Sequence, residues 1–229
     1  MAARRALVAW VVGSSAVAMA APFDVTTAFS MLRERVALPV LVQREGAFSF
    51  TDRPDVKGLA VDAKNGFIAW SEPSPAQQFE FALFRSTKKQ FVAVLFSLRG
   101  ERNAPTPPVT QLQAWTVDAS TSAITDAPKV VSSVPFLEAF VAASDVAAVG
   151  NLDDADVTPW LARVVKLPRQ GLTLEVTWAA GALERECATP KPRAPELLCR
   201  NIAVLKYSLR RATWSRTAGT FTLEPLAKR

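Results

Sequence analysis

The chain has 229 residues and carries 27 lysines and arginines against 21 acidic residues, with no histidine. A hydrophobic content of 49% with only nine glycines is ample for a packed core and argues against a disordered or low-complexity chain. The absence of histidine excludes Ser-His-Asp and Cys-His nucleophile systems and histidine-ligated metal sites. Any catalysis must therefore depend on carboxylates, on a serine–lysine pair or on a bound cation.

The first twenty residues have the layout of a secretory signal peptide. Arg4 and Arg5 precede an apolar run over residues 6–19, and Ala18-Met19-Ala20 places small residues where signal peptidase requires them. The apolar run is shorter than the ~20 residues of a membrane-spanning helix. We therefore expect residues 1–20 to be removed, a mature chain without a transmembrane span, and a periplasmic or secreted protein.

Residues 21–229 fit a single β-rich domain, or two halves over 21–134 and 135–229. Asp24 is placed to cap a helix that reaches about Val36, because apolar residues from Val25 onward recur at helical spacing. Another helix is predicted to open at Pro135, since proline fits the first turn of a helix.

Most of the remaining chain has the pattern of strands. Asn65-Gly66 is a hairpin-turn dipeptide between predicted strands over 57–61 and 67–70. A second hairpin over 78–84 and 91–98 is apolar on both faces, which places it at the centre of the sheet. Further strands are predicted over 112–117, 161–167, 172–178, 202–209, 211–215 and 220–223. The sequence thus predicts a mainly β, α+β protein, an antiparallel sheet or sandwich with two or three short helices.

Cys187 and Cys199 are the two cysteines of the chain. An even count in an exported protein favours a disulfide, and the spacing differs from the Cys-x-x-Cys pattern of redox sites. Three prolines between the cysteines prevent this loop from pairing as a strand. We expect the disulfide to tie the mouth of a hairpin formed by residues 172–178 and 202–209, and to contribute about 3 kcal/mol in the chain-entropy model.

Three short motifs recur in the same order in other proteins. They are Asn65-Gly66-Phe67, Ala82-Leu83-Phe84-Arg85 and the segment Leu167-Pro168-Arg169-Gln170-Gly171-Leu172-Thr173. With these motifs the chain resembles, over about residues 60–224, an uncharacterised family of secreted bacterial β-rich proteins. It departs from the family pattern around Trp115, where a tyrosine-rich strand is expected, and in the 187–199 loop. The resemblance implies export and a β-rich fold, and it implies no activity, cofactor or catalytic residue.

Positive charge is concentrated at the C-terminal end. Residues 181–229 contain ten lysines and arginines against four acidic residues. A basic surface outside the cytoplasm can bind lipid phosphates, acidic glycans or nucleic acid. The alternative is that these lysines and arginines are solvated and only prevent strand edges from associating. The residues predicted to form a binding surface on the C-terminal hairpin are Lys191, Arg193, Arg200, Arg210 and Arg211.

An acidic loop is a candidate calcium site, because Ca²⁺ prefers several hard oxygen ligands. The spacing lacks the EF-hand pattern, and the alternative is a solvated loop whose aspartates cap a helix. The candidate ligands are Asn151, Asp153, Asp154 and Asp156.

Two other patterns are candidates for catalysis. Ser86 and Lys89 match the Ser-x-x-Lys motif of penicillin-binding proteins, but they lie in a predicted hairpin turn and the Lys-Thr-Gly partner is absent. Glu80 and Glu175 are candidates for a glycosidase-type carboxylate pair, although strand alternation places both on a wet, polar sheet face.

The sequence therefore predicts an exported, non-enzymatic binding or envelope-accessory protein. Its basic C-terminal hairpin would contact an anionic envelope component or another exported protein. The alternatives are a carboxylate-dependent hydrolase of extracellular or cell-wall polymers, and a carrier of apolar ligands in a cavity lined by tryptophans. We expect no cofactor, and no nucleic-acid partner because no nucleic-acid motif accompanies the basic residues.

Overall fold

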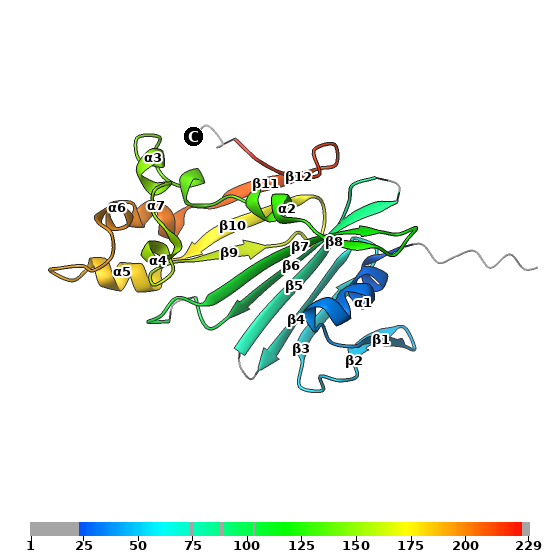
Figure 1. Ribbon diagram of the computed structural model, residues 1–229. Helices are drawn as coiled ribbons and strands as arrows, with labels where there is room; N and C mark the ends of the chain where they lie inside the picture. Colours follow the sequence, from blue (N-terminus) through cyan, green and yellow to red (C-terminus); the bar gives the residue numbers. More distant parts are fainter. Residues whose placement is uncertain (1–22, 74–75, 88, 103, 226–229) are drawn as a thin grey trace, which may run out of the picture.

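Three antiparallel sheets and a set of short helices make up the fold (Figure 1). The computed structural model describes residues 23–73, 76–87, 89–102 and 104–225, so the predicted signal peptide lies outside the described residues. The predicted β-rich α+β class is confirmed. The described residues form seven short α-helices where two or three were predicted, because helices of four or five residues are too short to show an apolar period. None of the helices within the described ranges is long and apolar enough to cross a membrane.

The largest sheet is a six-stranded meander in which each strand pairs with the next along the chain. The Asn65-Gly66 turn is confirmed, and Gly66 adopts a φ of +73° there. A Cβ on Gly66 would lie 3.0 Å from the Leu83 carbonyl oxygen, so this turn requires glycine. The strands are β3 (Lys57–Asp62), β4 (Phe67–Pro73), β5 (Ala76–Arg85), β6 (Gln90–Arg99), β7 (Val109–Asp118) and β8 (Ile124–Asp126).

Helix α1 (Val25–Val36) and the hairpin of β1 (Leu41–Arg44) and β2 (Ala47–Phe50) cover one face of this sheet. The predicted cap is confirmed, because Asp24 accepts a hydrogen bond of 2.9 Å from the Thr27 N–H. Phe29 of α1 is fully buried, and its ring centroid lies 5.3 Å from that of Phe81 and 5.5 Å from that of Trp70. These edge-on ring contacts fix the helix on the sheet.

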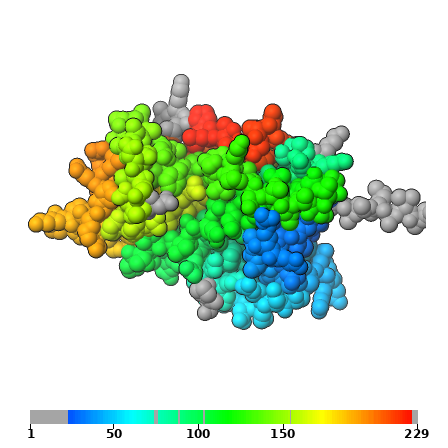
Figure 2. Space-filling view, viewed as in Figure 1, coloured from blue at the N-terminus to red at the C-terminus, as the bar shows by residue number. Residues whose placement is uncertain are grey.

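The same helix also covers the outer edge of β8. Arg35 donates one hydrogen bond of 3.2 Å to the Ile124 carbonyl and another of 3.0 Å to the Asp126 carboxylate. Figure 2 shows α1, in blue, lying against the green surface of this region. The edge of the six-stranded sheet is thereby closed by a charged side chain.

A four-stranded sheet covers the other face of the six-stranded sheet. The Phe84 ring of β5 lies 5.4 Å from the Trp214 ring and 5.2 Å from the Phe221 ring, and the Trp214 indole N–H donates to the Arg85 carbonyl. Strands β5 and β6 are therefore covered on both sides, as their two apolar faces predict. The four-stranded sheet has the order β12-β11-β10-β9 and consists of β9 (Ala162–Lys166), β10 (Thr173–Ala179), β11 (Arg210–Ser215) and β12 (Thr220–Leu223).

The segment between β10 and β11 is helical and holds the predicted Cys187–Cys199 disulfide. It forms α5 (Gly181–Cys187), α6 (Glu196–Arg200) and α7 (Ile202–Tyr207). The prediction of a strand over 202–209 is wrong, because Leu198, Ile202 and Leu205 fall at i, i+4 and i+7 and pack as one helical face on the core. The disulfide thus joins α5 to α6 within the connection between the paired strands β10 and β11.

The helix predicted to open at Pro135 is also largely absent. Phe136 is extended, and only a short 3₁₀ helix follows over Leu137–Ala139. The preceding helix, α2 (Pro128–Ser132), begins instead at an earlier proline.

Replacing both Cys187 and Cys199 by serine should lower the free energy of unfolding by about 3 kcal/mol, since the disulfide restricts the unfolded chain. Urea unfolding followed by tryptophan fluorescence measures the loss. The wild-type protein in reducing agent is the control and should unfold at the same urea concentration as the double variant. A loss well below about 1 kcal/mol would show that helix packing alone orders this region.

Candidate functional site

A pocket of about 460 Å³ lies between the start of β7 and the start of β9. Its walls combine polar and apolar surface, and the apolar side chains among them include Pro108, Val109, Phe136, Leu161 and Trp178. Val109 and Phe136 keep 58% and 37% of their surface exposed, which is high for large apolar side chains. The size and the presence of several apolar side chains fit a small ligand or a peptide side chain. We call it the Arg163 pocket after the charged residue in its lining.

Arg163 supplies the positive charge of this pocket. It is the cross-strand partner of Trp178, so the two side chains project from the same face of the four-stranded sheet. Its guanidinium lies 5.3 Å from the centroid of the Phe136 ring and donates a hydrogen bond of 3.3 Å to the Val134 carbonyl. Within the part of the chain that the structure describes, no carboxylate pairs with it.

Burial lowers the pKa of the Arg163 guanidinium below its usual value. An arginine nevertheless remains protonated in a protein, so the pocket contains a half-buried cation that no carboxylate of the described residues neutralises. Such an arrangement costs free energy, and an anionic group bound beside the guanidinium would offset that cost.

Trp178, opposite Arg163, has an unsatisfied donor. Its indole Nε1 is buried and has no hydrogen-bond partner among the described residues, although a buried indole N–H normally finds one. The Phe136 ring packs against Trp178 at a centroid distance of 5.4 Å. The buried indole N–H of Trp178 is thus left without an acceptor, on the strand next to that of Arg163.

Arg210, one of the predicted binding residues, continues the same row of side chains. Its guanidinium lies 5.6 Å from the Phe140 ring centroid and donates to the Ala139 carbonyl, and Phe140 in turn packs 5.9 Å from Trp178. Burial lowers the pKa of Arg210 as well. The row therefore has a cation at each end and three aromatic rings between them, and it fixes the segment after α2 on the sheet.

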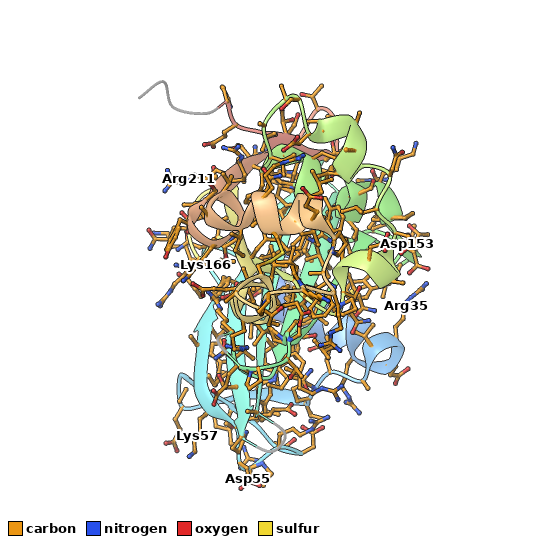
Figure 3. All side chains as sticks on the ribbon, turned by 90° about the vertical axis from the view of Figure 1, so that its left-hand side faces the viewer. Arg35, Asp55, Lys57, Asp153, Lys166 and Arg211 are labelled. Carbon is orange, nitrogen blue, oxygen red and sulfur yellow. A yellow bond between two sulfur atoms is a disulfide. The ribbon has the colours of Figure 1, made fainter. Side chains whose placement is uncertain are left out.

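The other predicted basic residues are distributed over separate elements. Arg193 pairs with Glu186 at 3.2 Å, Arg200 with Asp145 at 3.0 Å, and Arg211 with Glu175 at 3.1 Å. Lys191 is exposed on the loop between α5 and α6, which projects from one end of the molecule (Figures 1 and 2). In Figure 3, Arg211 and Lys166 lie on one side of the molecule and Asp153 on the other. The structure therefore does not gather the five residues into one surface.

The acidic loop forms a helix cap. The Asp156 N–H donates to the Asp153 carboxylate at 2.9 Å, and the Asp153 N–H donates to the Asp156 carboxylate at 3.1 Å. This reciprocal pair begins α4 (Asp154–Val157) and favours the capping alternative. Asn151 is exposed, the side chain of Asp154 is not described, and the described side chains contain no group of three or more acidic or cysteine residues placed to hold a metal.

The two carboxylates considered for catalysis have structural contacts. The prediction of a wet position is wrong for Glu80, because the four-stranded sheet covers it and its carboxylate accepts a hydrogen bond of 2.6 Å from the Leu167 N–H. Burial raises the pKa of Glu80, against the opposing effect of this hydrogen bond. Glu175 lies in register between Lys166 and Arg211. Neither carboxylate lines the Arg163 pocket.

Ser86 and Lys89 lie in the turn between β5 and β6, as predicted. The Ser86 N–H donates to the Gln90 carbonyl at 3.0 Å, which closes the hairpin. The helical context that brings the lysine of a Ser-x-x-Lys motif to its serine is therefore absent from this turn.

No protein-family model and no curated protein matches the chain. One solved structure is similar to it, the structure of a domain of an uncharacterized protein from Porphyromonas gingivalis W83. The identity is 12% over 82% of this chain and 79% of that chain, with a TM-score of 0.43. A likeness at this level carries no argument about function, so the functional argument depends on the pocket itself.

Replacing Glu80 by glutamine should make the protein increasingly stable relative to wild type as the pH rises from about 4 to about 7. Because its pKa in the folded state is raised above 4.5, Glu80 favours the folded state most at low pH, and this contribution is lost as the pH rises through the folded pKa. The glutamine amide oxygen can still accept from the Leu167 N–H without ionising.

Urea unfolding at several pH values measures this difference. Glu80→Ala is the matched variant, and it should be destabilised throughout the range because it leaves the Leu167 N–H without an acceptor. A Glu80→Gln difference that does not change with pH would contradict the effect assigned to burial.

Proposed function

We propose that this protein is an exported, non-enzymatic binding protein whose ligand carries a carboxylate on an apolar body and occupies the Arg163 pocket. The observation that carries the proposal is the half-buried Arg163 guanidinium, which has no carboxylate partner among the described residues and lies in a pocket with several apolar side chains in its walls.

A carboxylate suits this arginine better than a neutral acceptor does. Arginine and carboxylate form charge-assisted, often bidentate hydrogen bonds, which are about twice as strong as neutral ones. The Phe136 ring and the Val134 carbonyl already hold the guanidinium in place, which reduces the entropy lost on binding.

The walls of the pocket favour an apolar body next to this carboxylate. Pro108, Val109 and Leu161 provide aliphatic surface, and Phe136 provides an aromatic ring. Contact of these groups with an apolar ligand removes both surfaces from water, which is worth about 25 cal/mol for each Å² buried.

Two features support export. Residues 1–20 have the layout of a signal peptide, and the Cys187–Cys199 disulfide suits an oxidising compartment. The ligand would then belong to another exported protein or to an anionic component of the envelope. The C-terminal arginines are secondary in this proposal, because Arg193, Arg200 and Arg211 already pair with carboxylates.

Replacing Arg163 by glutamine should weaken binding of a carboxylate probe about 10- to 100-fold, since a hydrogen bond to a charged group contributes about 1.5–3 kcal/mol. Decanoate and N-acetylphenylalanine are suitable probes, each compared with its neutral amide by calorimetry. The wild-type protein should prefer each acid to its amide, and Arg163→Gln should remove that preference.

Arg211→Gln is the matched control, because Arg211 is exposed on another strand and pairs with Glu175. This variant should keep the preference for the acids. Urea unfolding should show that Arg163→Gln remains folded under the conditions of the binding measurement, so that a loss of affinity does not reflect a loss of structure. Equal affinity of wild type and Arg163→Gln for the acids would overturn the proposal.

A further inference from the structure

In the part of the chain that the structure describes, half of β7 has an edge with no hydrogen-bonded strand, and this edge borders the Arg163 pocket. All of β7 pairs with β6, from Val109 to Asp118, whereas β8 pairs only with residues 115–117. Among the described residues, the first half of β7 therefore has no strand partner on the side away from β6. Thr110, in this half, lines the pocket.

The direction of the free backbone groups follows from the hydrogen bond of Ala114. Its carbonyl accepts from the Ala127 N–H at 2.9 Å, so Ala114 directs its backbone groups away from β6. Backbone groups alternate in direction along a strand, so the N–H and C=O of Leu112 and Thr110 also point away from β6. Across the described ranges, no strand pairing or other hydrogen bond occupies these four groups.

We infer that the ligand is an extended polypeptide segment that pairs with this edge of β7 and places a carboxylate on Arg163. This inference rests on the proposed function and names the chemical class of its ligand. The bound segment adds a short antiparallel or parallel strand to the six-stranded sheet, and one of its apolar side chains contacts Phe136 and Trp178.

The edge favours a polypeptide over an acyl chain or a glycan. Thr110 and Leu112 offer alternating donors and acceptors at the two-residue repeat of a strand, about 6.8 Å. Only another backbone matches this repeat with acceptors and donors of its own, whereas an acyl chain leaves all four groups unpaired. The affinity of such strand addition comes from main-chain hydrogen bonds, and its specificity comes from pockets for alternate side chains.

The carboxylate of the bound segment has two chemical sources. It is either the C-terminal carboxylate or the side chain of an aspartate or glutamate, and both offer the same paired oxygens to a guanidinium. The peptide probes below separate these two sources.

The probes are octapeptides of alternating valine and threonine in three forms: with a free C-terminus, with a C-terminal amide, and with a C-terminal amide and a glutamate before the last residue. At least one acidic form should bind the wild-type protein about tenfold more tightly than the neutral amide, and Arg163→Gln should abolish the difference. Preference for the first form identifies a C-terminal carboxylate, and preference for the third identifies an acidic side chain.

Methylation of single peptide nitrogens tests the strand pairing. Only every second peptide N–H faces β7. A methyl group on one of these nitrogens should weaken binding about tenfold, whereas a methyl group on a nitrogen that faces away from β7 should leave binding unchanged. Thr110→Pro should also weaken peptide binding, since proline removes an outward N–H and leaves the β6–β7 hydrogen bonds in place. Gln111→Ala, which changes an exposed neighbouring side chain, is the control.

The outcomes distinguish this inference from the proposed function. Suppose that decanoate binding requires Arg163, but that the acidic peptides bind no better than the neutral amide or that the effect of N-methylation is the same at all positions. The polypeptide inference then fails and the proposed function stands. If neither decanoate nor any peptide depends on Arg163, both fail.

Discussion

The two apolar faces of β5 and β6 impose the architecture of the whole chain. Residues 92–98 of β6 are buried without interruption, so side chains on both faces of the sheet are removed from water. A sheet of this kind is stable only with a layer on each face. The segment before β3 provides one layer with α1 and the β1–β2 hairpin, and the segment after β8 provides the other with the four-stranded sheet. The Arg163 pocket lies at the end of this second layer, where β7 extends beyond β8.

Local signals in the sequence were sufficient for much of the fold. The Asp24 cap, the Asn65-Gly66 turn and the alternating strand over 172–178 each depend on neighbouring residues, and each is confirmed. The sequence predicts a strand in place of helix α7 because apolar residues there also occur at every second position. The helical spacing becomes visible only when Leu198 of the preceding helix is included.

The candidate site depends on contacts that no local pattern encodes. The one sequence signal for the site is that Arg163 interrupts a predicted apolar strand. Its importance comes from its position opposite Trp178 and from the absence of a carboxylate partner in the described part of the chain. Conversely, the arginines near the C-terminus form a basic segment in the sequence, yet Asp145 and Glu175, distant along the chain, pair with two of them. Charge along a sequence therefore indicates little about which cations the fold leaves without a counter-ion.

The hydrogen bonds of Arg35 to β8 have a consequence for the behaviour of the protein at high concentration. A sheet can grow into a fibre only if successive copies find free backbone groups at its outer strands, and the Arg35 guanidinium occupies the Ile124 carbonyl at one of them. The free stretch of β7 is short and lies between Pro108 and the start of β8 pairing, so a segment that fills it ends the sheet instead of offering a long new edge. Arg35 thus limits the addition of a further strand at the β8 edge of the sheet.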